Sequence, residues 1–135
     1  MPAPSIHAFA EKVALITDGE NPIGRAVALQ LALQGAYVIV GFANSSEEST
    51  RAIEELKSLG TLANAVETDI STVEGAKKLV AEVEKMFGRI DLLVHTASFE
   101  PQLPFPETDE DIWQKTVDVN VKSFFFVMQS AFNLM

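Results

Sequence analysis

The segment LITDGENPIGRA, residues 15–26, contains residue types that could hold a phosphate. A short apolar run leads into a turn that carries Gly19 and Gly24, and an apolar helical pattern follows. Glycine lets backbone N–H groups approach a phosphate closely, and the first turn of a helix presents unpaired N–H groups with a favourable dipole. Arg25 adds a positive charge. The segment therefore predicts a turn that binds the phosphates of a nucleotide.

Other residues of the same turn oppose that chemistry. Asp18 and Glu20 place negative charge near the expected phosphates, and Pro22 fixes a backbone angle and removes one N–H donor. Two like charges about 4 Å apart repel by roughly 4 kcal/mol at an effective dielectric constant of 20. The letters ENP are equally typical of an ordinary helix start, with Asn21 as the N-cap. We expect weakened phosphate binding here, and a purely structural turn is the alternative.

Apolar runs that alternate with helical patterns must position this turn. Strands are predicted at residues 12–17, 36–42, 62–69 and 90–97. The intervening helices have start and stop signals: capping boxes of Ser45 with Glu48 and of Ser71 with Glu74, and terminal glycines at positions 35, 60 and 88. After a loop rich in proline, a long helix is predicted from about Asp109, with a break near Asn120.

This alternation predicts an α/β fold with a parallel sheet and helices on both faces. Right-handed crossovers favour the strand order 3-2-1-4, half of a doubly wound sheet. In such sheets a ligand binds beyond the carboxyl ends of the strands, where the strand order reverses. Residues 18–22, 43–46, 68–71 and 95–100 are therefore expected to form one site.

Composition narrows the classes of function. The chain of 135 residues has 47% hydrophobic and 21% charged residues, which fits a single globular domain over residues 1–135. A net charge of −9 argues against nucleic acid or an anionic membrane as partner. We find no membrane-spanning run, no secretory signal in residues 1–12, no cysteine and no metal-binding pattern. A cytoplasmic location is expected.

The four loops, in their order, resemble those of the short-chain dehydrogenase/reductase family, and most closely its 3-oxoacyl-carrier-protein reductase branch. The family motif T-G-x-x-x-G-[IL]-G is matched in part by residues 17–24, and the N-N-A-G segment after the fourth strand corresponds to residues 95–98. The best matches are GRIDLLVHTAS and VDVNVKSFFFVMQSA, residues 88–98 and 117–131. The likeness covers the whole chain.

The resemblance implies a Rossmann-like fold and a dinucleotide cofactor. The implied cofactor-binding residues are Thr17, Gly19, Asn21, Ile23, Gly24, Arg25, Asn44, Ser45, Asp69, Ile70, His95 and Ala97. NADP(H) is favoured over NAD(H), because the loop Asn44-Ser45-Ser46 lacks the acidic residue that binds the ribose 2′-hydroxyl in relatives that prefer NAD. Asp18, Glu20 and Pro22 are expected to weaken this binding.

Three of the candidate site residues also allow structural roles. Asn120 corresponds to a member of the family's proton relay, but it could instead satisfy backbone groups where its helix breaks. Asp69 could hold the adenine ring or precede a helix cap. His95 could contact a ligand or serve as a structural group. Both readings stay open for each residue, and the structural one is favoured for Asn120 and His95.

The resemblance also implies catalytic residues that these 135 residues do not contain. The family's serine and its Y-x-x-x-K motif have no counterpart, and Tyr37 lies at the start of a strand. We therefore expect an N-terminal portion that is catalytically incomplete by itself. The alternative is a non-catalytic relative that associates with other copies through the helix of residues 109–135.

Overall fold

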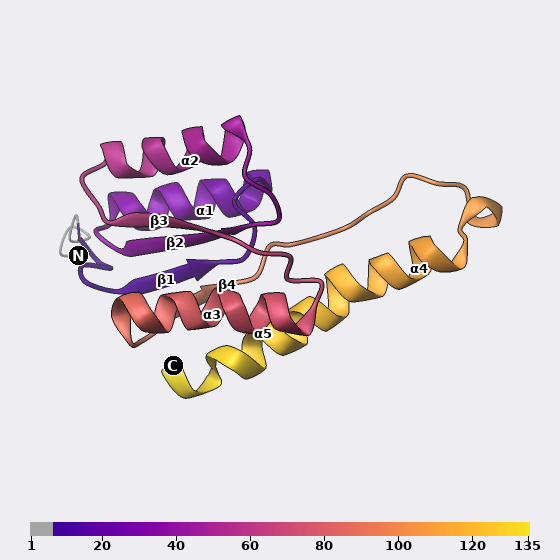
Figure 1. Ribbon diagram of the computed structural model, residues 1–135. Coiled ribbons are helices and arrows are strands. Elements are labelled where there is room, and N and C mark those ends of the chain that lie inside the picture. The colour runs from indigo at the N-terminus through magenta and orange to yellow at the C-terminus, as the bar shows by residue number, and fades with distance from the viewer. Residues whose placement is uncertain (1–6) are drawn as a thin grey trace, which may run out of the picture.

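The computed structural model describes residues 7–135, so residues 1–6 of the segment tested for a secretory signal lie outside the description. Its strands form one parallel sheet in the order β3-β2-β1-β4, as predicted. They are β1 (Val13–Ile16), β2 (Tyr37–Phe42), β3 (Ala63–Glu67) and β4 (Leu92–Val94). All four therefore point their carboxyl ends toward the same edge of the sheet (Figure 1).

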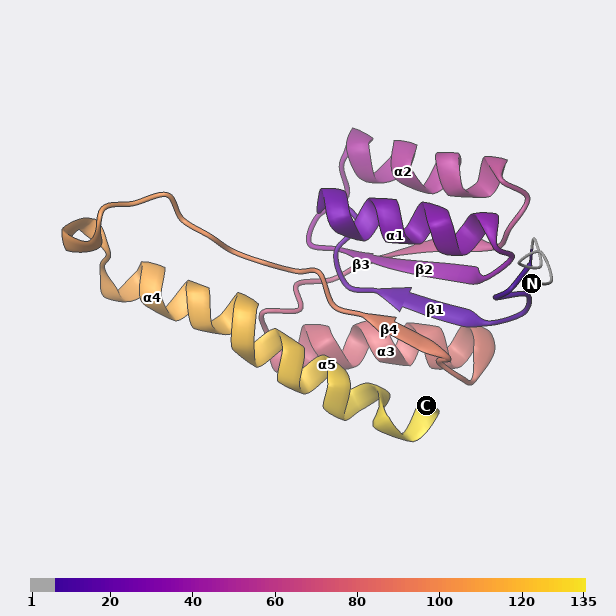
Figure 2. The same cartoon turned by 180° about the vertical axis from the view of Figure 1, so that it is seen from behind.

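Helices alternate with the strands and cover both faces of the sheet (Figures 1 and 2). The α-helices are α1 (Pro22–Leu33), α2 (Glu47–Ser58), α3 (Val73–Phe87), α4 (Glu110–Val117) and α5 (Ser123–Ala131). Short 3-10 turns occupy Phe105–Glu107 and Phe132–Leu134. The glycines predicted to end the first three helices, at positions 35, 60 and 88, all have positive φ, which glycine adopts without strain.

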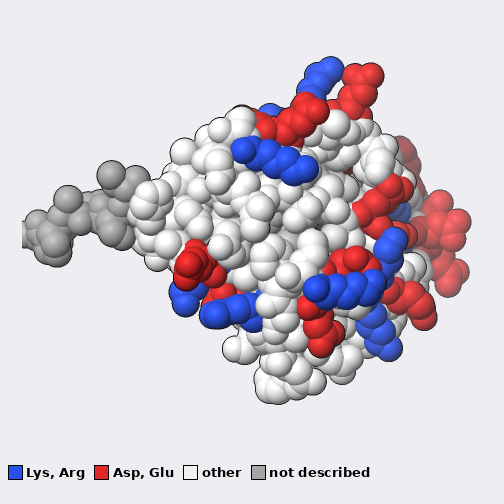
Figure 3. All heavy atoms as spheres, turned by 60° about the vertical axis from the view of Figure 1, so that its left-hand side comes forward, with Lys and Arg blue, Asp and Glu red and all other residues white. Residues whose placement is uncertain are grey.

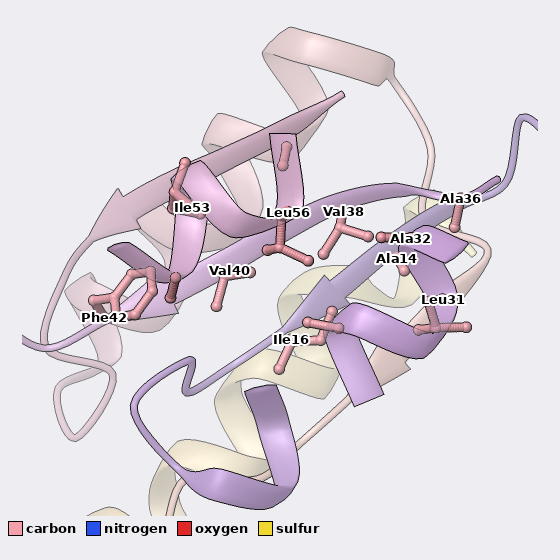
Figure 4. Close-up of a cluster of buried hydrophobic side chains, with 13 residues drawn as sticks. Ala14, Ile16, Leu31, Ala32, Ala36, Val38, Val40, Phe42, Ile53 and Leu56 are labelled. Atoms are coloured by element: carbon pink, nitrogen blue, oxygen red, sulfur yellow. The ribbon is translucent and has the colours of Figure 1, made fainter. Parts of the chain in front are cut away.

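The central strands are buried on both faces because two helical layers pack against them. On one face, Ile16, Val38 and Val40 pack with Leu31 of α1 and Leu56 of α2 (Figure 4). On the other face, Val13, Leu15 and Ile39 pack with Leu79 and Val83 of α3 and with Val127 of α5. These two apolar clusters hold the strands and the helices together, so the carboxyl ends of the strands stay side by side at one edge.

Both predicted capping boxes are wrong: each helix is capped one residue later than predicted, and α3 has a single side-chain cap rather than a box. Ser46 is the N-cap of α2: its hydroxyl accepts the N–H of Ser49 at 3.0 Å, and the Ser49 hydroxyl accepts the N–H of Ser46, which completes the box. Thr72 is the N-cap of α3, and its hydroxyl accepts the N–H of Gly75 at 3.0 Å. Neighbouring hydroxyl residues can each cap a helix, so the three-dimensional path of the loop decides between them.

Strand β4 is shorter and more exposed than predicted. Only Leu92–Val94 form the strand, and each of the three residues is half-buried. β4 is an edge strand that pairs with β1 alone. The expectation of a fully buried fourth strand over residues 90–97 is therefore wrong.

The C-terminal helical segment runs from beside α3 out beyond the sheet (Figures 1 and 2). Asp109 is the N-cap of α4, close to the predicted start, and a π-helical turn at Asp118–Lys122 interrupts the α-helical pattern where a break was predicted near Asn120, but the segment continues as a helix. α5 packs beside α3, whereas α4 has no buried residue and extends beyond the sheet (Figures 1 and 2).

Candidate nucleotide-binding site

A cleft of about 210 Å³ opens where the strand carboxyl ends meet. It brings together residues from all four predicted loops: the whole of 68–71, three residues of 95–100, two of 18–22 and one of 43–46. Its lining is Thr17, Asp18, Glu20, Ala43, Thr68, Asp69, Ile70, Ser71, Ala97, Ser98, Phe99, Lys115 and Val119. Of the predicted cofactor residues, Thr17, Asp69, Ile70 and Ala97 line it directly.

The turn between β1 and α1 is held by two of its own side chains. Asp18 Oδ1 accepts the N–H groups of Glu20 at 3.0 Å and Asn21 at 3.2 Å. Asn21 Oδ1 accepts those of Ile23 at 2.9 Å and Gly24 at 3.4 Å. The expected N-cap role of Asn21 is thus confirmed, and α1 begins with Pro22 in its first position.

The same turn is tied to the loop after β4. The Thr17 hydroxyl accepts the N–H groups of Thr96 at 3.0 Å and Ala97 at 3.4 Å. Asn21 Nδ2 donates to the Thr96 carbonyl at 3.0 Å, and the Thr96 hydroxyl donates to the Asp18 carbonyl at 3.1 Å. Thr17 is 3% exposed, so its main role here is to join the two loops.

Close approach explains the two glycines that the turn retains. A Cβ on Gly24 would overlap the Asp18 carbonyl oxygen and the Thr96 hydroxyl, and one on Gly19 would overlap Val40 and Phe42. Ile23 is also a predicted cofactor residue. Its side chain is 68% exposed and faces away from the core, so Ile23 contributes to the turn through its backbone.

Two serines after β2 hydrogen-bond to carboxylates of neighbouring loops. Ser45 donates to Glu67 at the end of β3, and Ser46 donates to Glu20 at 2.9 Å. A second, open hollow of about 470 Å³ is lined by Ser45, Ser46, Glu47, Thr50 and Arg51. Asn44 is exposed and lines neither hollow.

The loop after β3 supplies both a carboxylate and an apolar wall. Asp69 Oδ1 accepts the N–H of Ser71 at 3.0 Å and its hydroxyl at 2.6 Å. Ile70 is 8% exposed and faces the cleft. Asp69 therefore orders the loop that leads to α3, and it also lines the cleft. This position is compatible with both predicted roles, a contact to the adenine ring and a place just before a helix cap.

His95 lies behind the cleft rather than in its lining. Its Nε2 is 3.3 Å from the buried Ser123 hydroxyl, and its Nδ1 is buried without a hydrogen-bond partner among the described residues. Burial lowers the pKa of His95, and the nearby Asp18 carboxylate opposes that shift. Burial therefore favours the neutral form of the ring.

Asn120, the residue matched to the family's proton relay, makes backbone contacts. Its Oδ1 accepts the N–H of Phe99 at 2.8 Å, and its Nδ2 donates to the Phe99 carbonyl at 2.9 Å. Both amide atoms thus hold the loop after β4 against the π-helical turn. The predicted satisfaction of backbone groups is observed, but on the neighbouring loop and not on the helix itself.

Arg25, which was expected to add positive charge at the phosphate turn, forms an ion pair with α2 instead. Its guanidinium donates to Glu55 of α2 at 2.7 Å and 3.2 Å, which raises the pKa of Arg25. Lys115, which the sequence did not single out, is the one lysine or arginine in the lining of the cleft, and its Nζ lies 4.3 Å from the centre of the Phe99 ring. The sequence did hold one signal for Lys115: it lies five residues before Asn120 on the same predicted helix, and Asn120 was a predicted site residue.

Charges on the face drawn in Figure 3 are mixed, with lysine and arginine side chains lying beside aspartate and glutamate. Among residues 7–135 no helix is long and apolar enough to cross a membrane, and no group of three or more His, Cys, Asp or Glu is arranged to hold a metal.

A parallel sheet in the order 3-2-1-4, with a cleft at the point where the strand order reverses, defines a Rossmann-like nucleotide-binding fold. Residues 12–135 match the family profile described as short chain dehydrogenase. The chain therefore belongs to the short-chain dehydrogenase/reductase family, which confirms the resemblance seen in the sequence.

Curated relatives include the hydroxynaphthalene reductase arp2 of Aspergillus fumigatus, 31% identical over 90% of this chain and 45% of the relative. The 3-oxoacyl-[acyl-carrier-protein] reductase FabG of Staphylococcus aureus is 33% identical over 89% of this chain and 49% of the relative. A solved short-chain dehydrogenase/reductase from Serratia marcescens superposes with a TM-score of 0.90 at 27% identity, covering 96% of this chain and 53% of that one. The chain spans about half the length of these relatives.

Proposed function

We propose that residues 1–135 form the dinucleotide-binding portion of an NADP(H)-dependent carbonyl reductase or alcohol dehydrogenase. The supporting observation is the cleft, in which Asp69, Ile70 and Ala97 from the ends of β3 and β4 meet. The cofactor would supply a hydride to a carbonyl carbon or accept one from an alcohol. The chain's own residues would bind and orient its adenosine half.

The preference for NADP(H) over NAD(H) belongs to this proposal. No carboxylate lies between the end of β2 and Glu47, and the hollow there offers the hydroxyls of Ser45 and Thr50 and the guanidinium of Arg51. These groups suit a 2′-phosphate. Three carboxylates oppose a phosphate here: Glu47 lines the hollow and pairs with Arg51 at 3.1 Å, Glu67 accepts the Ser45 hydroxyl, and Glu20 accepts the Ser46 hydroxyl at 2.9 Å. A 2′-phosphate would therefore have to replace Glu47 as the partner of Arg51.

Titration calorimetry with NADPH and NADH tests the proposal. We expect saturable binding with NADPH the tighter ligand, and Ala97→Leu, which fills the cleft, should abolish both. Ala65→Leu, at an exposed alanine of β3, is the matched control and should bind like the wild type. Absence of binding up to millimolar concentrations, or equal binding by the Ala97→Leu variant, would refute a cofactor site in the cleft.

We further propose that the isolated 135-residue chain does not turn over a carbonyl substrate. Asn120, the one matched catalytic position, has both amide atoms engaged by Phe99. The only tyrosine, Tyr37, stacks on Phe87 at a ring separation of 5.5 Å within the packed face of β2. NADPH oxidation that depends on an added ketone, measured spectrophotometrically, would contradict this. A cytoplasmic location also stays a prediction.

A second candidate function is association with further copies through residues 109–135. It is favoured by exposed apolar side chains on and after α5: Phe124, Phe125, Met128 and Phe132 are 46–79% exposed. If this face is an interface, light scattering should show a dimer or larger species, and Phe125→Glu should shift it toward the monomer. Glu100→Gln lies outside that face and serves as a control. A monomeric wild type would contradict this function.

A further inference from the structure

We infer that the cleft recognises the adenosine half of its ligand, whereas the turn between β1 and α1 is closed to the pyrophosphate by its own side chains. The inference rests on the proposed cofactor site and deepens it. It assigns the affinity to the base and ribose and predicts that the pyrophosphate, normally held at a helix N-terminus in such folds, adds little.

Every backbone N–H from residue 19 to residue 25 already has an acceptor within the chain. Asp18 Oδ1 takes the two donors of Glu20 and Asn21, and Asn21 Oδ1 takes those of Ile23 and Gly24. The remaining donors are bonded to backbone carbonyls: Gly19 N–H to Gly41 at 3.0 Å and Arg25 N–H to Asn21 at 2.9 Å, while Pro22 has none. A phosphate would have to displace side-chain oxygens that are held in place.

Charge reinforces this closure. The Asp18 carboxylate sits at the centre of the turn, and the Glu20 carboxylate is kept nearby by the Ser46 hydroxyl at 2.9 Å. Arg25, the cation within the turn, is paired with Glu55 at 2.7 Å. A pyrophosphate that enters the turn would have to replace the side-chain oxygens as acceptor of the N–H groups. It would also meet the uncompensated carboxylates of Asp18 and Glu20.

The adjoining cleft shares Asp18 and Glu20 with the turn, but its other walls have the opposite character. Its walls are mainly apolar, from Ala43, Ile70, Ala97 and Val119, and its volume of about 210 Å³ suits a purine nucleoside rather than a whole dinucleotide. Asp69 uses Oδ1 for its bonds to Ser71, which leaves the second carboxylate oxygen as an acceptor for an amino group on the base. A flat aminopurine therefore matches the cleft in size and in chemistry.

Calorimetry with adenosine and ADP as probes separates the two regions. For the wild type we expect ADP and adenosine to bind with dissociation constants within threefold of each other. Asp18→Gly removes the charge and frees two N–H donors, so the ratio of the adenosine to the ADP dissociation constant should rise at least tenfold over the wild type. Because Asp18 also lines the cleft, this ratio is the readout rather than the adenosine affinity alone. Asp18→Asn removes the charge but keeps the acceptor, and it should give a smaller gain.

Asp109→Gly is the matched control, because it makes the same charge change at the N-cap of α4, where glycine is tolerated. It should leave both affinities unchanged. Wild-type ADP binding tenfold or more tighter than adenosine would overturn the closed turn and leave the cofactor proposal standing. Absence of adenosine binding in the wild type and in both Asp18 variants would overturn the adenosine assignment together with the proposed function.

Discussion

Two regions at the same edge of the sheet differ in what their side chains present to a ligand. Between β1 and α1, short polar side chains at positions 18 and 21 take the local N–H groups, so the turn is closed on itself. After β3 and β4, Ile70 and Ala97 instead line an open, largely apolar cleft. The position of a loop in this fold therefore does not decide its chemistry; the side chains that compete with a ligand do.

The closed turn should tolerate the least change in volume. Gly24→Ala would drive a Cβ into the Asp18 carbonyl oxygen and the Thr96 hydroxyl, which join the two loops. We expect a loss of roughly 3 kcal/mol in unfolding free energy, the upper range for overpacking. Urea denaturation measures it, with Gln30→Ala on the exposed face of α1 as the control. Wild-type stability would show that the loops do not pack as described.

Removing the N-cap of α1 should lower the stability of the protein and raise its affinity for ADP. Asn21→Ala deletes the acceptor for two N–H groups and the bond to Thr96, so the protein should lose about 1 kcal/mol of stability. The same change frees donors, and ADP should therefore bind more tightly. Asp109→Ala, which removes the N-cap of α4, should lower stability alone. Loss of ADP binding in Asn21→Ala would contradict the closed turn.

The cation of the open cleft should contribute modestly. Lys115→Gln removes the lysine over Phe99, and we expect NADPH affinity to fall about two- to fivefold, in line with roughly 0.5–1 kcal/mol for an exposed charge. The effect should shrink as salt is added. Lys122→Gln, whose lysine pairs with Asp118 outside the cleft lining, is the control. An unchanged affinity would exclude Lys115 from ligand binding.

The smallest expected effect is a pH dependence of stability that arises from His95, which lies behind the cleft. Burial holds the pKa of His95 below its usual value, so the unfolded chain takes up this proton before the folded chain as the pH falls below about 6.5. Stability should therefore decline between pH 7.5 and 5.5. His95→Gln should flatten the decline in urea midpoints, and His7→Gln, at an exposed position, should not. An unchanged decline in His95→Gln would place the titrating group elsewhere.

The sequence predicted the fold because its signals are local and repeated. Apolar runs and terminal glycines gave the strand order and the helix ends, and they placed Asp69 and Ala97 at one edge. It misplaced both capping boxes because adjacent hydroxyl residues compete for a single cap. Lys115 was missed because it lies on α4, outside the four loops at the strand ends, and helical periodicity does not encode which cleft a side chain lines.

The most direct test is an NMR titration of the ¹⁵N-labelled chain with NADPH. If the cleft binds the adenosine half beside a closed turn, the largest amide shifts should occur at Asp69–Ser71 and Ala97–Phe99, with smaller changes over residues 19–25. Dominant shifts within residues 19–25, shifts confined to the exposed face of α5, or no shifts at millimolar ligand would contradict the account.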